Sequence, residues 1–270
     1  MKKLFLSLIL LLIFATPCFG ATFHAAQSGG WRTAATWAEN SGYPVAGDTV
    51  IFDAGSAGVT VTLAESNACA VIDMTGNTTG VLAMGGYSIT VTGNITLAGS
   101  GSNVTGTTGY ILNNGSNTIT CNSIALPNIM FMAPSGTVTL GSDLVVTGTI
   151  KYAAITTMAG AYDISCGTLT SAYNITLVTG QDLTISTAIA LGSNYFGALT
   201  IASSTGTATN LIYNGTAANS KIAGVTFTNV TVTGTGASIY NWFGSGTNTG
   251  ITNVTNSDVS SGSGGGSWGF

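Results

Sequence analysis

Apolar and hydroxyl-bearing residues alternate along most of this chain with a period of two. In the run Ile89, Thr90 and Val91, the two aliphatic side chains share one face and the threonine lies on the other. Such alternation, over short runs bounded by Gly, Asn or Ser, is typical of a β-strand with one buried face. The same pattern occurs at 59–63, 95–97, 138–140, 175–177, 183–185, 225–227 and 230–232. We therefore expect an all-β protein.

The alternating runs recur as a unit of strand, short turn and strand. The units begin at residues 89, 119, 138 and 164, at intervals of 30, 19 and 26 residues. A loose period of roughly 20 to 30 residues is typical of a solenoid, whose coils bury their apolar faces against their neighbours. The expected fold is a single-chain parallel β-helix with an N-terminal cap. A β-sandwich or jelly roll is the alternative, since it also has many short strands and Gly-rich turns.

Aligning these units predicts a row of inward residues and explains the cysteines. The predicted core stack is Val91, Cys121, Leu140 and Cys166. The cysteine spacing, with Cys69 as a further member, matches neither a small disulfide framework nor a CxxC metal site. In this alignment Cys121 and Cys166 lie two coils apart, and coils about 4.8 Å apart would place them too far apart for a disulfide. We expect buried free thiols.

The first twenty residues have the pattern of a secretory signal peptide. Lys2 and Lys3 precede an apolar run, and the small residues Cys18 and Gly20 follow it. The run is shorter than the roughly 20 residues that a membrane-spanning helix needs. Pro17 argues against lipidation of the adjacent cysteine. We expect cleavage after Gly20, export to the cell surface or the medium, and no membrane span.

Composition narrows the class further. Only 5% of residues are charged, 45% are hydrophobic and 38 are glycine, so Thr, Ser and Asn must form most of the polar surface. Without Lys2 and Lys3, three basic residues face nine acidic ones. No basic patch is available to hold phosphates, which makes nucleic acid an unexpected partner.

The chain is expected to divide into five segments. These are a signal peptide at 1–20, an N-terminal cap segment at 21–57, β-solenoid repeats at 58–236, a C-terminal cap at 237–259 and a Gly/Ser-rich tail at 260–270.

The segment after the expected cleavage point differs from the repeats. Trp31 and Trp37 are followed by Pro44, then by Ala-Gly-Asp ending at Asp48 and by a Val-Ile-Phe strand pattern. This segment resembles the opening of secreted or phage-borne right-handed parallel β-helix surface proteins, and more loosely that of G8-type domains. The resemblance implies a cap whose aromatic side chains cover the open end of the solenoid, with Asp48 fixing the turn into the first coil.

Residues able to perform chemistry are few. His24 is expected to be a solvated residue near the new N-terminus. A polysaccharide lyase or hydrolase would need clustered carboxylates, whereas Asp48 and Asp53 form the only close pair. The remaining aspartates stand apart in turns, at 73, 143, 163 and 182, and the cations available are Arg32, Lys151 and Lys221. We therefore expect no enzyme, no metal site and no cofactor.

The candidate glycan-contact residues are aromatic: Trp31, Trp37, Tyr240 and Trp242. Buried aromatic rings more often serve packing, which is the alternative role for the tryptophan pair. The sequence favours a secreted, non-enzymatic structural or adhesin-like surface protein that binds extracellular glycans or associates with itself. Three alternatives stay open: a β-helix polysaccharide-degrading enzyme, a phage tail or decoration protein, and an ice-binding solenoid. The Thr-x-Thr motifs resemble the rows of ice-binding solenoids and begin at residues 60, 90, 118, 137 and 231.

Overall fold

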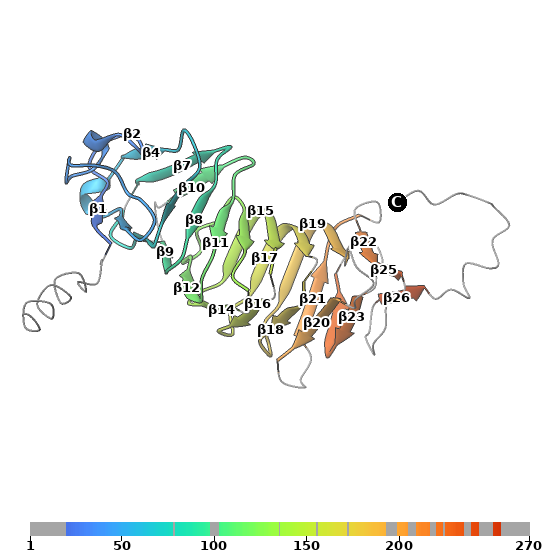
Figure 1. Ribbon diagram of the computed structural model, residues 1–270. Coiled ribbons are helices and arrows are strands. Elements are labelled where there is room, and N and C mark those ends of the chain that lie inside the picture. The colour runs from blue at the N-terminus through green and yellow to red at the C-terminus, as the bar shows by residue number, and fades with distance from the viewer. Residues whose placement is uncertain are drawn as a thin grey trace, which may run out of the picture.

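The computed structural model shows a chain that is nearly all β and wound into stacked parallel coils (Figure 1). It describes residues 20–77, 79–97, 103–134, 136–154, 156–171, 173–192, 199–204, 209–216, 220–223, 225–234, 239–242 and 251–254. The helical residues among these form two short 3-10 helices, η1 (Ala34–Thr36) and η2 (Ala54–Ser56). The predicted fold class, a parallel β-solenoid, is confirmed.

Each coil contributes to two or three parallel sheets. The ten-stranded sheet runs β1 (Thr22–His24), β3 (Thr49–Ile51), β6 (Val71–Met74), β9 (Ile95–Leu97), β12 (Asn117–Thr120), β14 (Gly136–Leu140), β16 (Thr156–Ala159), β18 (Ile175–Leu177), β20 (Leu199–Ser203) and β23 (Val225–Thr228). The four-stranded sheet runs β2 (Gly29–Gly30), β4 (Thr60–Thr62), β7 (Val81–Gly85) and β10 (Asn103–Gly106).

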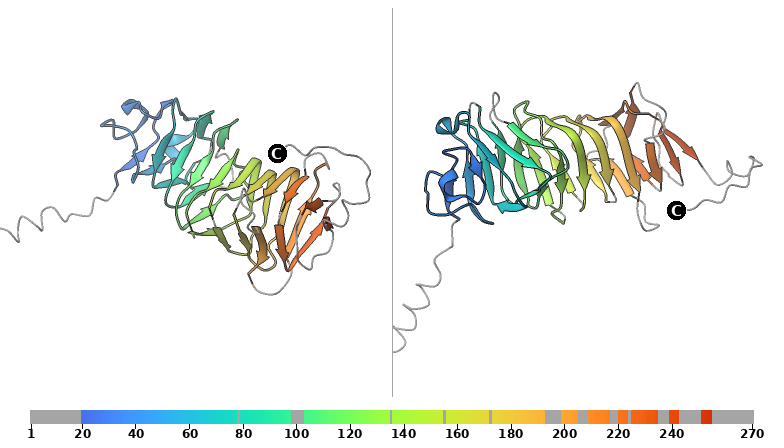
Figure 2. Two further views of the ribbon diagram at one scale, coloured as in Figure 1. Left: turned by 45° about the vertical axis from the view of Figure 1, so that its right-hand side comes forward. Right: turned by 90° about the horizontal axis from the view of Figure 1, so that it is seen from above.

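The twelve-stranded sheet forms the remaining face. It runs β5 (Asn67–Cys69), β8 (Ile89–Val91), β11 (Ile111–Asn113), β13 (Ile129–Phe131), β15 (Leu144–Tyr152), β17 (Ile164–Ser171), β19 (Leu183–Gly192), β22 (Ser220–Ala223), β25 (Ile239–Trp242) and β26 (Ile251–Val254), with β21 (Thr209–Tyr213) beside β19 and β24 (Val230–Thr233) beside β21. In the two further views the coils follow one another along a single axis (Figure 2).

Strand pairing decides between the two expected folds. In the part of the chain that the structure describes, each pairing between strands is parallel and joins a strand to one from an adjacent coil. Among the described residues, the single antiparallel bridge joins Ala25 and Trp37. Two antiparallel sheets facing one another would require the opposite pattern, so the β-sandwich alternative is wrong.

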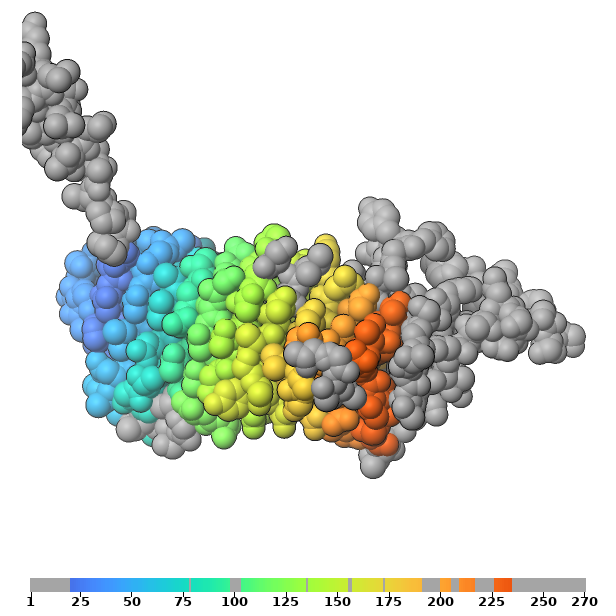
Figure 3. Space-filling model, turned by 90° about the horizontal axis from the view of Figure 1, so that it is seen from below, coloured from blue at the N-terminus to red at the C-terminus, as the bar shows by residue number. Residues whose placement is uncertain are grey.

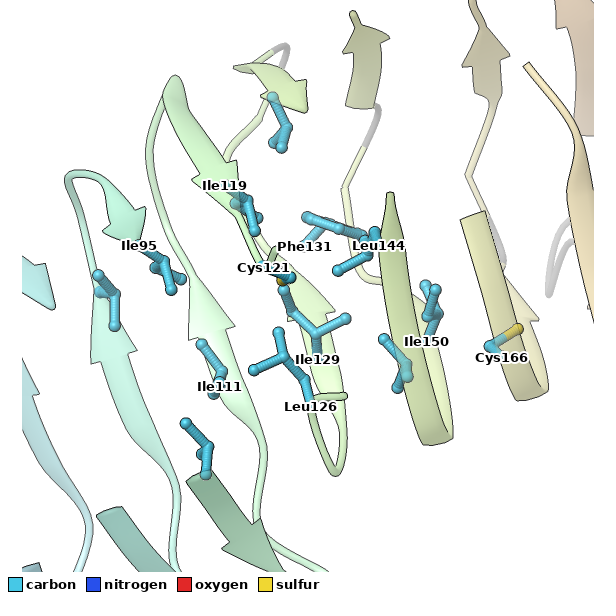
Figure 4. Close-up of a cluster of buried hydrophobic side chains, with 14 of the residues drawn as sticks. Ile95, Ile111, Ile119, Cys121, Leu126, Ile129, Phe131, Leu144, Ile150 and Cys166 are labelled. Atoms are coloured by element: carbon cyan, nitrogen blue, oxygen red, sulfur yellow. The ribbon is translucent and has the colours of Figure 1, made fainter. Parts of the chain in front are cut away.

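Rows of aliphatic side chains hold the coils together. On the twelve-stranded sheet Ile111, Ile129 and Ile150 are register partners on consecutive coils, and each is fully buried (Figure 4). The outward neighbours in these strands are polar or partly exposed, as the period-two pattern predicts. Each buried aliphatic side chain contributes about 1.5–3 kcal/mol through removal of apolar surface from water. The core is therefore one continuous aliphatic column.

The predicted core stack is only partly right. Val91, Cys121, Leu140 and Cys166 are all buried, but they do not form one row. The error arose because alternation shows that a residue points inward without showing which sheet its strand joins. In the structure, Val91 pairs with Cys69 and Asn113, Leu140 with Ile119, and Cys166 with Val146 and Ile185, while Cys121 follows the end of β12.

The boundaries of the coils also differ from the expected segments. β1 and β3 already belong to the ten-stranded sheet, so the solenoid begins inside the segment expected to be a separate cap. At the other end β25 and β26 extend the twelve-stranded sheet into the range assigned to a C-terminal cap. Residues 1–19 of the expected signal peptide (1–20) and the Gly/Ser-rich tail (260–270) lie outside the described residues.

The three described cysteines are free and buried, as expected. Burial raises the pKa of the Cys69, Cys121 and Cys166 thiols to about 12. Since the thiolate is the reactive species, we expect a thiol-disulfide reagent at pH 8 to label the folded protein at least about 100-fold more slowly than the unfolded chain. Absorbance at a chromogenic reagent's product band measures both rates, and equal rates would show that the thiols are not in the core.

The same thiols make stability depend on alkaline pH. Because the folded-state pKa lies above the unfolded value of about 8.5, their contribution is complete below that pH and is lost as pH rises toward 12. We therefore expect a lower midpoint of thermal unfolding at pH 10.5 than at pH 8. Equal midpoints would contradict a stabilising contribution from the protonated thiols.

Candidate functional site

Aromatic packing closes the N-terminal end of the solenoid. Trp31 and Trp37 are each only 1% exposed, and their rings meet edge to face with centroids 5.3 Å apart. Phe23 packs against Trp37 at 6.0 Å. The indole N–H of Trp31 donates to the Pro44 carbonyl at 2.9 Å, and that of Trp37 to the Trp31 carbonyl at 2.8 Å. Neither ring has a face open to a sugar, so their glycan-contact role is not supported and the capping role fits.

The chain also covers the free edge of the first strand. The Ala38 N–H donates to the His24 carbonyl at 2.8 Å, and the Ala26 N–H donates to the Thr36 carbonyl at 2.9 Å. The His24 N–H donates to the Glu39 carboxylate. We call residues 36–39 the edge cover. Unpaired strand edges invite association with other chains, so the edge cover opposes end-to-end assembly at this end.

His24 is not simply solvated, contrary to expectation. Its Nδ1 lies 2.9 Å from Oδ2 of Asp53, and both side chains are less than half exposed. Asp53 is the N-cap of η2 and accepts from the Gly55 N–H at 2.8 Å. The hydrogen bond from His24 is the main cause of a lowered Asp53 pKa. The nearby Ser56 hydroxyl donates to the Ala25 carbonyl and is thus not aligned on the imidazole as a nucleophile would be.

Asp48 turns the opposite way, into the fold. Its side chain is 7% exposed. Oδ2 accepts from the Val45 N–H at 2.8 Å, and Oδ1 accepts from the Ala21 N–H at 2.7 Å. These bonds close the turn through Gly47 that leads into β3, in agreement with the role that the resemblance implied. Asp48 and Asp53, although close in sequence, do not form one site.

Three aspartates expected to be separate form a ladder. The Asp163 N–H donates to Oδ1 of Asp143 at 3.0 Å, and the Asp182 N–H donates to Oδ1 of Asp163 at 2.9 Å. The Asn210 side-chain amide continues the series to Oδ1 of Asp182. Their sequence separations of 20 and 19 residues equal one coil, which is the signal that sequence reasoning missed. Each carboxylate links one coil to the next.

No metal site emerges from these acidic residues. Within the described ranges, no group of three or more His, Cys, Asp or Glu side chains is arranged to hold a metal ion. The described ion pairs are His24 with Asp53 and Arg32 with Glu65.

Outward threonines align on the ten-stranded sheet. Thr137, Thr157 and Thr176 are register partners on β14, β16 and β18, and Thr118 and Thr139 form a second row on β12 and β14. We call these five residues the threonine face. Figure 3 views the molecule from the side on which these strands lie in Figure 1, and successive coils appear there as adjacent bands. Strands β9 to β23 of this sheet contain no charged residue.

The Thr-x-Thr motifs are spread over several faces. Those at 118 and 137 belong to the threonine face, whereas the motif at 60 lies on the four-stranded sheet and those at 90 and 231 follow the strands of the twelve-stranded sheet. Threonines of different motifs therefore align only when their strands belong to the same sheet. The same holds for the buried residues of the predicted core stack.

The two remaining aromatic candidates fall in β25. The structure places the backbone of Tyr240 and Trp242 in the twelve-stranded sheet, and their side chains lie outside what it describes. Other large aromatics are exposed in turns between strands, namely Tyr43, Tyr87, Tyr162 and Tyr173. These were not predicted, because isolated turn tyrosines carry no periodic signal.

Comparisons with protein-family models, with curated proteins and with solved structures find no match for this chain. In the described part of the chain, no helix has the length and apolarity to cross a membrane. The fold and its faces define the class as a parallel β-solenoid with a closed first coil and a neutral hydroxyl-bearing sheet.

Proposed function

We propose that this chain is a secreted, non-enzymatic surface protein that binds an extended neutral glycan through the threonine face. The observation that carries the proposal is the two rows of outward threonine hydroxyls in register on uncharged strands. Neighbouring strands lie about 4.8 Å apart, and alternate residues in a strand about 6.7 Å apart. The face is thus a two-dimensional array of hydrogen-bonding groups.

An extended polymer suits such an array better than a small sugar. A single exchanged hydrogen bond contributes only about 0.5–1.5 kcal/mol net, so one or two threonines give weak binding. A polysaccharide that lies across several coils adds such contacts without further loss of overall freedom. The low charge of the face favours neutral polymers, because no cation is present on these strands to pair with uronic acids or sulfates.

A lysine in the middle of the face should disrupt binding. Thr157 is exposed and has a threonine partner on each side, so Thr157→Lys interrupts the row with a long charged side chain. We expect at least a tenfold loss of affinity for neutral polysaccharide, measured by pull-down with insoluble polymers and by titration with soluble ones.

Thr90→Lys is the matched control, since Thr90 is an outward threonine on the twelve-stranded sheet. The affinity of Thr90→Lys for neutral polysaccharide should stay within about twofold of that of the unmodified chain. A substitution on a surface away from the threonine face has little effect on the fold. Equal losses in both variants, or none in either, would contradict a binding role of the threonine face.

Ice is the second candidate ligand, favoured by one specific observation. Coil length changes from 21 to 20 to 19 residues between β12 and β18, yet Thr118 stays in register with Thr139, and Thr137 with Thr157 and Thr176. Differences of one or two residues in coil length therefore enter the turns rather than the sheet, and they do not disturb these rows. An ice-recrystallisation assay separates the two ligands: inhibition that Thr157→Lys abolishes, without polysaccharide binding, would assign the face to ice.

A further inference from the structure

The carboxylate of Asp48 is buried, and neither of the described ion pairs includes it. It is the one charged side chain among the buried residues that the structure describes. Both of its oxygens accept backbone N–H groups, from Ala21 and Val45. The two ion pairs of the described chain lie elsewhere. Because a buried charge without an opposite charge is costly, a cationic partner at this position would stabilise the first coil.

The backbone nitrogen of Ala21 occupies the position that a cationic partner of Asp48 would take. Its nitrogen lies 2.7 Å from Oδ1 of Asp48, and its carbonyl accepts the Thr49 N–H at 2.8 Å. The next residue begins β1, which pairs with β3. The backbone of Ala21 is therefore fixed on both sides by the first coil, and its nitrogen points at the buried carboxylate.

We propose that a signal peptidase hydrolyses the Gly20–Ala21 bond and that the new α-ammonium group of Ala21 forms an ion pair with Asp48. The proposal rests on the signal peptide expected from the sequence and is independent of the ligand of the threonine face. One water molecule is consumed: its oxygen completes the Gly20 carboxylate, and the released amine of Ala21 takes up a proton. The neutral amide donor at Asp48 thereby becomes a charged donor.

The surroundings of Gly20 support this cleavage position. Gly20 is exposed and directly precedes Ala21. A Cβ atom added there would lie 1.7 Å from the Gly47 carbonyl oxygen, so the uncleaved chain can dock only with glycine at this position. Hydrolysis removes the crowded residue and leaves Ala21 in place. The bond to Asp48 already has an ionised acceptor, and a charged donor adds the attraction between opposite charges at a buried position, so processing tightens the first coil.

Two full-length mature chains test the ion pair. One begins at Ala21 and the other retains Gly20, which moves the ammonium group one residue away from Asp48. We expect the chain beginning at Ala21 to unfold about 3–6 °C higher. Asp48→Asn, which keeps the side-chain shape and an acceptor oxygen, should reduce that difference to about 1 °C or less. Asp53→Asn, which changes a half-buried carboxylate near the same end that is paired with His24 rather than with Ala21, should leave the difference unchanged.

Two measurements make each outcome decisive. N-terminal sequencing of the exported protein should find Ala21 first, and any other first residue would overturn the cleavage site. A difference between the two chains that is absent, or that persists in Asp48→Asn, would overturn the ion pair. If Asp48→Asn does not fold, N-acetylation of the chain beginning at Ala21 removes the charge with Asp48 intact, and an unchanged unfolding temperature would then refute the pairing.

Discussion

Trp37→Ala should lower the midpoint of thermal unfolding by about 10 °C. Trp37 is almost completely buried, contacts Phe23 and Trp31, and satisfies its indole N–H within the fold. Removal of a buried tryptophan costs about 3–5 kcal/mol, and each kcal/mol corresponds to about 2–4 °C in a domain of this size. The cavity would lie under the first coil, where no further coil can compensate.

Tyr43→Ala is the matched control, because Tyr43 is an aromatic residue of the same coil that is 38% exposed. Its contact with Arg32, 5.5 Å from the ring centroid, is worth about 0.5–1 kcal/mol at an exposed site. Circular dichroism on heating measures both variants. A Trp37→Ala midpoint close to that of Tyr43→Ala would mean that the aromatic cluster does not hold the end of the solenoid closed.

Gly160→Ala should be nearly as damaging, for a different reason. Gly160 has φ of +84°, and a Cβ atom there would lie 2.3 Å from the Leu140 carbonyl oxygen of the neighbouring coil. The backbone strain alone is about 1–2 kcal/mol for a residue with a side chain. The collision adds to it, because coils held about 4.8 Å apart by hydrogen bonds cannot separate locally without breaking them. We expect a total loss of at least about 3 kcal/mol.

Gly180→Ala measures the cost of backbone strain without a steric clash. Gly180 has φ of +80° and follows the next strand of the same sheet, but a Cβ atom there meets nothing within 4 Å. It should lose only about 1–2 kcal/mol. Chemical denaturation gives the free energy of unfolding for both variants. Equal losses would show that close approach of the coils at Gly160 does not limit the fold.

The sequence contained enough information to predict the strands and the class of fold. Alternation around residues such as Val138 and Ile175 marks one buried face, and both are buried in the ten-stranded sheet. The free, buried cysteines followed from the same alternation. Capping by Trp31 and Trp37 was implied by the resemblance of the opening segment to β-helix surface proteins. These are local patterns that do not depend on the path of the chain.

The assignment of strands to sheets could not be predicted in the same way. A coil with several faces presents the same alternation on each of them, so the unit at 89 was aligned with the unit at 119 although Ile89 and Ile119 belong to different sheets. The aspartate ladder was missed because its signal is a coil-length separation between Asp143, Asp163 and Asp182. That separation becomes visible only when the length of each coil is known.

The edge cover at residues 36–39 gives the solenoid a direction of growth. Its bonds to the backbone of β1 seal one end of the ten-stranded sheet within the first coil. The N-terminal coil is the first part of the mature chain to emerge, so it can form before the later coils. The sealed coil can then act as a template that later coils join only from the other side. In an array where each unit contacts its neighbours alone, a sealed first coil leaves one side open to the next coil, and we expect it to keep incomplete molecules from pairing through their first strand.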